Sequence, residues 1–308
     1  MDRLRNRIET ATAWLAFPVI LMASLFATMA IMDAGVPPFV AFIGPVVVSF
    51  LLIALLEKTS PFETQWSHSR GDLGVDIGHA LVSGGLTLGT LRPFVLAGSV
   101  AAAGWLAATL GRSIWPGNWP LLAQLVLALV VGEFFMYWVH RLTHMYDGLW
   151  RIHAMHHSAP RLYFLNSIRF HPIDIALSIF IPLFVLAILG AQQPVLALFT
   201  VTASVHGAFQ HANTKIRCGP LNWFFSMAEL HRWHHSQRPE EANSNFGQNL
   251  IVWDIVFGTR FLPADRMPPA KIGLAQLPSF PMNYLGQLAS PFRWATIKRE
   301  SGESLGRL

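Results

Sequence analysis

Two long stretches near the start of the chain contain no charged residue, and they most constrain how it can fold. One is Ala13 to Met32 and the other is Pro37 to Leu56, and each has 20 residues. A helix of about 20 apolar residues can cross the hydrocarbon core of a bilayer. Because only Asp33 to Val36 separate the two stretches, we expect a transmembrane helical hairpin.

Three further regions have the same character. Ala80 to Gly111 is apolar except for Arg92, although several glycines and a proline interrupt it. Trp119 to Gly132 is uncharged, and the helix is expected to continue to His140. Ile175 to Thr214 has no acidic or basic residue apart from histidine, and Gly190 to Pro194 break it in the middle. Together with the hairpin, these regions predict about six membrane crossings.

The charged residues support a membrane protein and indicate its orientation. Only 13% of the residues are charged, and 53% are hydrophobic. Soluble domains carry about a quarter charged residues, and disordered chains are richer still in charge. Segments 1–12, 57–79, 140–174 and 214–308 hold 20 of the 22 Lys and Arg residues. Basic residues gather on the cytoplasmic side, so we expect a multi-pass membrane protein with both termini in the cytoplasm. This also explains the net charge of +5 without a nucleic-acid partner.

The predicted fold class is therefore all-α, a polytopic membrane protein of about six crossings with a cytoplasmic helical cap. We expect an N-terminal transmembrane hairpin at 1–56, a main membrane domain at 57–262 and a C-terminal cytoplasmic tail at 263–308. The single cysteine, Cys218, excludes a disulfide framework, a cysteine-based zinc module and an iron–sulfur cluster bound within this chain.

The 13 histidines fall mostly in the predicted cytoplasmic segments or at the membrane ends that meet them. They form one His-x-x-x-His motif and two His-x-x-His-His motifs, made by His140 and His144, by His153, His156 and His157, and by His231, His234 and His235. On a helix, positions i, i+3 and i+4 share a face, so each motif presents its imidazoles together. His206 and His211 end the last predicted crossing at the same membrane face, and we expect them to join the cluster.

Ten imidazoles are more than one ion can bind, and they predict two metal ions with about five histidines each. Neutral imidazole suits iron, zinc, copper and nickel. Such ligands need hydrogen-bond acceptors that hold each imidazole in one tautomer. The acidic candidates for this role are Glu133, Asp174, Glu229 and Asp254.

From about Leu56 to Leu262, the chain resembles the fatty acid hydroxylase and sterol desaturase superfamily. The resemblance rests on the three histidine motifs and on several accessory strings. These are Asn166 with Arg169-Phe170-His171-Pro172, His211-Ala212-Asn213, Asn245-Phe246-Gly247, Trp253-Asp254 and Phe257-Gly258-Thr259.

The resemblance implies a non-haem di-iron centre, O₂ as co-substrate and a lipid substrate that enters from the bilayer. It implies that the eight motif histidines are iron ligands, with His206 and His211 as an additional pair. It also places His171 near the metals without ligating them, and marks Asn166, Arg169 and Asn213 as further candidates for their surroundings. The expected reaction is hydroxylation or desaturation of a sterol, a fatty acyl chain or a related lipid. Zinc can replace iron during overexpression, because it binds imidazole more tightly than ferrous iron.

Two other functions would also use clustered histidines. A zinc-dependent membrane hydrolase would normally need a His-Glu-x-x-His motif, which the sequence does not contain. A metal or proton transporter would place its histidines along several spans and not at one membrane face. The sequence also contains neither a Gly-x-Gly-x-x-Gly nucleotide loop nor a haem-binding His-Pro-Gly-Gly string. We therefore expect a separate electron donor of the ferredoxin, rubredoxin or cytochrome b5 type, with its NAD(P)H reductase.

Overall fold

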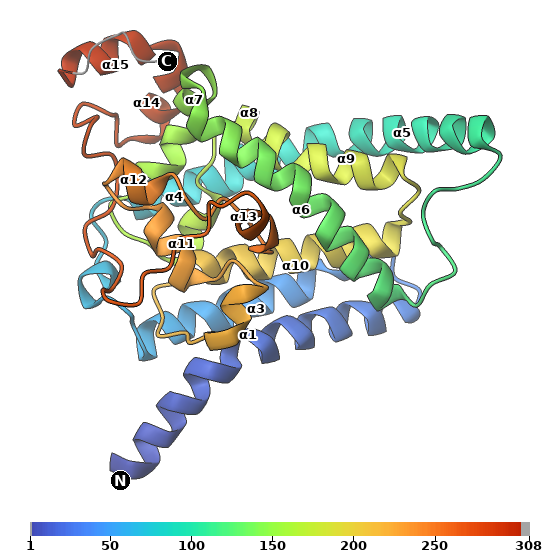
Figure 1. Cartoon of the computed structure of the whole chain (residues 1–308), viewed down its shortest axis with the longest axis horizontal. Helices are drawn as coiled ribbons and strands as arrows, with labels where there is room; N and C mark the ends of the chain where they lie inside the picture. The colour runs from blue at the N-terminus through green and yellow to red at the C-terminus, as the bar shows by residue number, and fades with distance from the viewer. Residues whose placement is uncertain (1, 303–308) are drawn as a thin grey trace.

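The computed structural model describes residues 2–302. Its secondary structure in that range consists of helices joined by loops, with two isolated backbone bridges and no strand. The body is a bundle of α1 (Asp2–Asp33), α3 (Ile43–Thr59), α5 (Gly85–Leu110), α6 (Leu121–Met145), α9 (Ile181–Ile188) and α10 (Gln193–His211). Helix α10 lies inside the bundle and packs against α1, α3 and α6, while α9 packs against α5 and α6. Figure 1 shows α1, α3 and α10 side by side, with α6 crossing them obliquely and with α9 beside α5.

Short helices gather at one end of the bundle and form the cap (Figure 1). They are α4 (Leu73–Gly78), α7 (Asp147–His157), α8 (Pro172–Ile175), α11 (Ala228–His234), α12 (Pro239–Ala242), α13 (Val252–Val256), α14 (Tyr284–Ala289) and α15 (Trp294–Glu300). Helix α2 (Pro38–Ala41) connects α1 to α3, and single helical turns occur at Thr64–Ser67, His79–Gly84, Phe164–Ile168, Ala176–Phe180, Gly219–Trp223 and Ser290–Phe292.

Three described helical segments are long and apolar enough to cross a membrane, namely Asn6–Asp33, Pro38–Thr59 and Leu121–Met145. They coincide with the predicted hairpin and with the predicted span that ends at His140. Shorter apolar helices occupy Ala97–Leu110 and Pro172–Ile188. The predicted all-helical fold is therefore confirmed for residues 2–302, with three candidate membrane-spanning helices among them.

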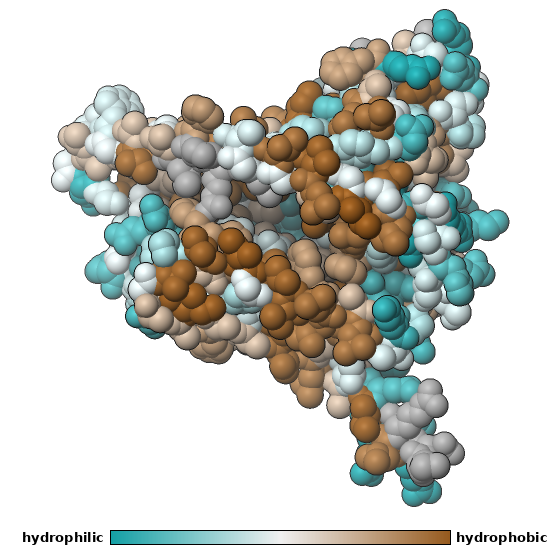
Figure 2. Space-filling model, turned by 180° about the vertical axis from the view of Figure 1, so that it is seen from behind, coloured by the Kyte–Doolittle hydropathy of each residue, from teal (hydrophilic) through white to brown (hydrophobic). Residues whose placement is uncertain are grey.

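The hairpin is held by packing and by a polar contact inside the apolar region. The hydroxyl oxygens of Ser24 in α1 and Ser49 in α3 lie 2.6 Å apart, and both side chains are buried. Outward-facing residues of both helices remain exposed, with Val19 at 58% and Leu51 at 66%. Figure 2 shows apolar residues gathered over the bundle and hydrophilic ones over the cap. Such a broad apolar surface is suited to lipid and not to water.

The predicted interruptions of the two longest apolar stretches differ in the structure: one separates two helices, and the other is a π-helical turn within a continuous helix. At Gly190 the chain adopts φ +103° between α9 and α10, and a β-carbon there would lie 2.7 Å from the Ser113 hydroxyl oxygen. This position separates the two helices as the sequence indicates. In the earlier stretch, a π-helical turn at His79–Gly84 leads directly into α5, which continues unbroken to Leu110.

The segment after Leu262 folds back onto the cap. Leu277, Phe280, Trp294 and Ile297 are buried against Ala154 and Met155 of α7. The Trp294 indole and the Lys298 amine also donate hydrogen bonds to Asp147 at the start of α7. This segment therefore supports the helix that carries the second histidine motif, while the predicted domain boundaries stay a prediction.

Candidate metal centre

Nine of the ten predicted histidines form two adjacent groups where the bundle meets the cap. The first group, site A, consists of His140, His144, His153, His157 and His234. The second, site B, consists of His156, His211, His231 and His235. Within each group, the nitrogen atoms that could bind a metal all lie within 4.8 Å of one another.

Helices α6, α7, α10 and α11 bring these residues together. The i, i+4 spacing places His140 and His144 on one face of α6. Helix α7 contributes to both sites, with His153 and His157 in site A and His156 in site B. Helix α11 and the residue that follows it do the same, with His234 in site A and His231 and His235 in site B. The two sites therefore share the helices that build them, and the His157 and His235 rings stack 4.5 Å apart across the boundary.

In site A, oxygen atoms accept hydrogen bonds from the Nδ1 atoms of four imidazoles. His140 Nδ1 is 2.7 Å from the Phe246 carbonyl oxygen, and His234 Nδ1 is 2.7 Å from that of Ser244. His153 Nδ1 is 2.7 Å from the Asp174 carboxylate. His144 Nδ1 is 3.2 Å from the Asn243 amide oxygen. Because carbonyl and carboxylate oxygens only accept, each Nδ1 carries the proton, and each Nε2 presents its lone pair to the site.

The Nε2 atoms that remain are arranged as metal ligands would be. His140 Nε2 and His153 Nε2 face each other at 3.1 Å. Two lone pairs at this distance repel unless a cation lies beside them. Two nitrogen ligands at right angles around an ion, with bonds of roughly 2.1 Å, would be about 3.0 Å apart. The Nε2 atoms of His144, His157 and His234 are buried and have no hydrogen-bond partner among the described residues. These residues fit a bound metal ion.

Site B also contains closely spaced, buried ring nitrogens, which belong to four imidazoles. His211 Nδ1 donates to the Asn166 amide oxygen at 2.8 Å, so its Nε2 presents a lone pair. That Nε2 lies 3.0 Å from His231 Nε2, which lies 3.1 Å from His235 Nε2. The Nδ1 atoms of His156, His231 and His235 are buried without a partner among the described residues. Site B therefore also fits a metal ion, with one imidazole fewer than the five that the sequence predicts.

Burial favours the neutral form of five cap histidines, which is the form that binds metals. It lowers the pKa of His156, His157, His231, His234 and His235 well below the usual value, and the neighbouring imidazoles lower it further. No proton therefore competes strongly with a metal ion at neutral pH.

His206 is the predicted ligand that the structure places elsewhere. It belongs to neither group, and its ring packs 5.4 Å from Phe17 and 6.0 Å from Phe225 inside the bundle. Residues five apart on a helix are turned about 140° from each other. His206 and His211 therefore point to different faces of α10, and only His211 faces the cap.

Two of the predicted supporting residues contact a histidine of the centre. Asp174 accepts from His153 and also from the Ser178 hydroxyl at 3.0 Å. Asn166 accepts from His211 and donates to the Arg161 carbonyl at 2.6 Å, which fixes its orientation.

The other predicted supporting residues hold the surrounding backbone. Asp254 accepts from the Phe246 and Gly247 amides, and Glu133 accepts from the Gln248 and Asn249 amides. Glu229 accepts from the Cys218 amide and the Asn222 side chain, and Asn213 bonds the backbone of Glu63. Arg169 pairs with Asp76, and His171 caps α8 by accepting from the Ile173 amide. None of these hydrogen bonds reaches a histidine of sites A or B.

The loop that orients site A was not predicted from the sequence. Asn243 and the carbonyls of Ser244 and Phe246 each accept from a site A histidine. Asn245 adopts φ +53°, which turns the backbone between the two carbonyls. Its side chain donates to the Leu230 and Phe261 carbonyls and accepts from the Phe261 amide. The Asn245-Phe246-Gly247 string was the available signal, since Asn tolerates the left-handed conformation better than other non-glycine residues.

Replacing Asp174 with Asn is expected to weaken the binding of ferrous iron by about 10- to 100-fold, because His153 loses the carboxylate that fixes its tautomer. Anaerobic titration of the purified chain with ferrous iron measures this. Glu229→Gln makes the same chemical change away from the histidines and should leave the affinity unchanged. Equal affinities in the two variants would contradict this role of Asp174.

Comparison with known proteins agrees with this geometry. The family model described as fatty acid hydroxylase matches residues 125–259. An ornithine lipid hydroxylase, OlsE of Rhizobium tropici, is 36% identical over 293 residues, which cover 93% of this chain and 86% of that protein. An alkylglycerol monooxygenase of Xenopus tropicalis is 30% identical over 134 residues, or 42% of this chain and 29% of that protein. No solved structure was found to match the chain.

The named relatives, together with the histidine cluster, define an oxidoreductase. The chain belongs to the fatty acid hydroxylase family. A relative named putative Δ7-sterol-C5(6)-desaturase 2, of Arabidopsis thaliana, is 31% identical over 168 residues, which cover 47% of this chain and 51% of that protein. The family therefore includes relatives named for hydroxylation and others named for desaturation, as the sequence motifs indicate.

Proposed function

We propose that the chain uses O₂ to hydroxylate a membrane lipid at a non-haem di-iron centre formed by sites A and B. The observation that carries the proposal is the pair of adjacent imidazole groups, each of which holds several buried ring nitrogens with no hydrogen-bond partner among the described residues. Iron bound there would supply the reduction of O₂ and the removal of hydrogen from an unreactive C–H bond. Overall, the C–H group, O₂, two electrons and two protons give an alcohol and water. Desaturation is the alternative outcome on the same centre.

The chain's own residues would hold and shield this centre. Asp174, Asn166 and the loop at 243–246 fix the imidazole tautomers by accepting the Nδ1 protons. Burial of the histidines keeps bulk water from the reaction. A cavity of about 200 Å³ reaches His144 and His157 from the cap and is also lined by Trp150. This cavity supports a cytoplasmic approach to site A for a small molecule or for the face of an electron donor.

We infer a membrane lipid as substrate, with ornithine lipid the first to test, because the hydroxylase named for it aligns along 93% of this chain. The test is lipid mass spectrometry of cells with and without the gene. A lipid that gains 16 mass units only when the gene is present supports hydroxylation, and a loss of 2 supports desaturation. Identical lipid profiles, with the protein present in the membrane, would contradict both.

We further propose about six crossings, with both termini and the metal centre on the cytoplasmic side, and the division into 1–56, 57–262 and 263–308. The distribution of basic residues supports this topology. Arg70→Cys and Asn118→Cys place exposed thiols on the two predicted sides. A membrane-impermeant reagent applied to intact spheroplasts should label only the Asn118→Cys variant. Labelling of Arg70→Cys instead would reverse the proposed orientation.

A further inference from the structure

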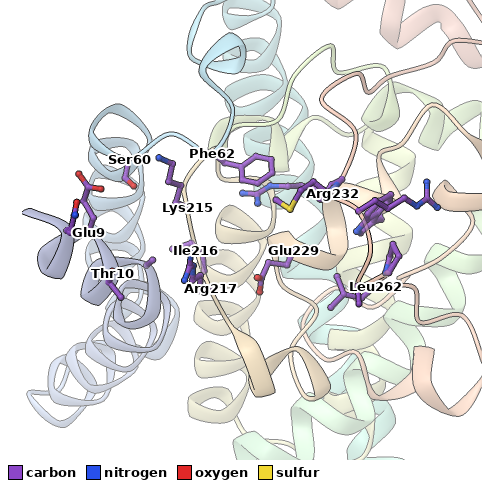
Figure 3. A pocket seen from close by; sticks show the side chains of 18 residues that line it. Glu9, Thr10, Ser60, Phe62, Lys215, Ile216, Arg217, Glu229, Arg232 and Leu262 are labelled. Carbon is purple, nitrogen blue, oxygen red and sulfur yellow. The ribbon is translucent and has the colours of Figure 1, made fainter.

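A large groove lies on the side of α11 that faces away from the metal sites. It has a volume of about 660 Å³ and is lined by the first turns of α1, residues 215–217, α11 and the loop at 262–268. Figure 3 shows Glu9 and Thr10 of α1 on one side, Lys215 and Arg217 between, and Arg232 and Leu262 on the other side. We call it the α1–α11 groove.

The groove lies at the height where the apolar part of the bundle ends. Ala13, the first residue of the uncharged stretch of α1, lines it, as does Ser60, which directly follows α3. The Arg217 amide donates to the Ala13 carbonyl at 2.8 Å, and the Lys215 amide donates to the Ser60 carbonyl at 3.0 Å. These bonds fix residues 215–217 against both helices of the hairpin. The groove therefore opens where lipid headgroups meet the protein.

Its charge is predominantly positive. Two carboxylates line it, those of Glu9 and Glu229. Glu229 already accepts from the Cys218 amide and the Asn222 side chain. Four basic side chains line it as well, namely Lys215, Arg217, Arg232 and Arg266. Arg266 pairs with Glu241, whereas Lys215 and Arg217 are exposed. The groove therefore attracts an anion.

Two buried donors lining the groove lack an acceptor. They are Nε of Arg232 and Nε1 of Trp233, which have no hydrogen-bond partner among the described residues. Both side chains are only 1% exposed. The Arg232 guanidinium is fixed, because it donates to the Ala212 and Thr214 carbonyls and stacks 3.6 Å from the centre of the Phe62 ring. Leaving such donors unpaired is unfavourable, and a phosphate or carboxylate oxygen would satisfy them.

The groove and the metal centre use different sides of the same helix. Glu229, Arg232 and Trp233 follow the i, i+3, i+4 spacing on one side of α11. His231 and His234 project from the other side into the metal sites. An occupant of the groove would therefore contact the helix that carries metal ligands without entering the centre.

We propose that the α1–α11 groove binds the anionic headgroup of a membrane lipid through its phosphate or carboxylate oxygens. Lys215 and Arg217 attract the headgroup at the membrane surface, and Arg232 and Trp233 receive its oxygens inside the groove. The acyl chains extend into the bilayer along the apolar part of α1. Binding there requires neither a metal ion nor turnover, so it can be tested separately from the oxygenase reaction.

The test is calorimetric titration of the full chain, in neutral detergent, with dihexanoyl phosphatidylglycerol. We expect saturable binding of one lipid per chain, and much weaker binding of dihexanoyl phosphatidylcholine and of inorganic phosphate. Each surface basic residue contributes about a fivefold change in affinity for anionic lipid, so the double variant Lys215→Gln/Arg217→Gln should bind about 25-fold more weakly. Trp233→Phe keeps an aromatic side chain but removes the donor, and should weaken binding by about fivefold.

The matched control is Lys271→Gln/Arg299→Gln, which removes two exposed basic residues of the cap that do not line the groove. Its affinity should equal that of the unchanged chain. Equal affinity for the two lipids, or unchanged affinity in the Lys215→Gln/Arg217→Gln variant, would overturn the proposal. Inorganic phosphate binding as tightly as phosphatidylglycerol would identify a site for a free anion and overturn the assignment to a lipid.

Discussion

Replacing His234 with Ala is expected to reduce the iron bound per chain from two ions to one and to lower turnover by at least about a thousandfold. His234 Nε2 is one of the buried, unpartnered nitrogens of site A, and metal-assisted chemistry requires the full ligand set. His235→Ala should have the same effect through site B. Iron analysis and lipid hydroxylation by the reconstituted protein measure the two results.

Two control variants test whether the effect belongs to the metal sites. His206→Phe changes a buried histidine of α10 that packs among aromatic rings outside both sites, and it should retain two iron ions. His68→Ala changes an exposed histidine and should retain full turnover. If His206→Phe lost iron while His234→Ala kept both ions, the assignment of ligands would be wrong.

The second large effect concerns the supply of electrons. The isolated chain with NAD(P)H, O₂ and lipid is expected to show no sustained turnover, because we propose that electrons come from a separate donor protein. Adding a ferredoxin, rubredoxin or cytochrome b5-type donor with its reductase should restore turnover in a reconstituted membrane. The basic segments, which we propose to be cytoplasmic, should attract an acidic donor, so raising the salt concentration should lower the rate of electron transfer.

Two different results would contradict the need for a donor protein and its electrostatic docking. Sustained turnover by the isolated chain on NAD(P)H would contradict the need for a donor. Rates that do not change with salt, measured when electron transfer limits turnover, would contradict electrostatic docking. In that case, topology and the attraction of anionic lipid would account for the positive charge.

Much of the centre could be predicted from the sequence because helical spacing decides which side chains share a face. His140 and His144 lie i, i+4 on α6 and meet in site A. The same rule applied to His206 and His211 would have separated them, since a spacing of five turns them about 140° apart. The resemblance to the family suggested both residues, and in the structure only His211 lies within a histidine group.

The acceptors that orient the histidines were harder to predict. Asp174 and Asn166 could be proposed because their side chains accept hydrogen bonds. The carbonyls of Ser244 and Phe246 are backbone groups that any residue would supply. Their positions depend on the left-handed turn at Asn245, and thus on tertiary contacts with residues 230 and 261.

The packing of the C-terminal segment against the cap was also hard to predict from the sequence. Residues 263–300 contain no long apolar stretch that would indicate packing against the rest of the chain. The buried contacts of Phe280, Trp294 and Ile297 with α7 depend on a few residues far apart in the sequence. Local periodicity cannot reveal such contacts, because they arise only when the cap assembles.

The iron content of the unchanged chain tests the central claim most directly. The purified full chain would be freed of metal, loaded anaerobically with ferrous ⁵⁷Fe, separated from unbound iron, and examined by elemental analysis and Mössbauer spectroscopy. The two imidazole groups predict two iron ions per chain, both in nitrogen-rich surroundings. One ion per chain, or none after loading, would contradict a di-iron centre built from sites A and B.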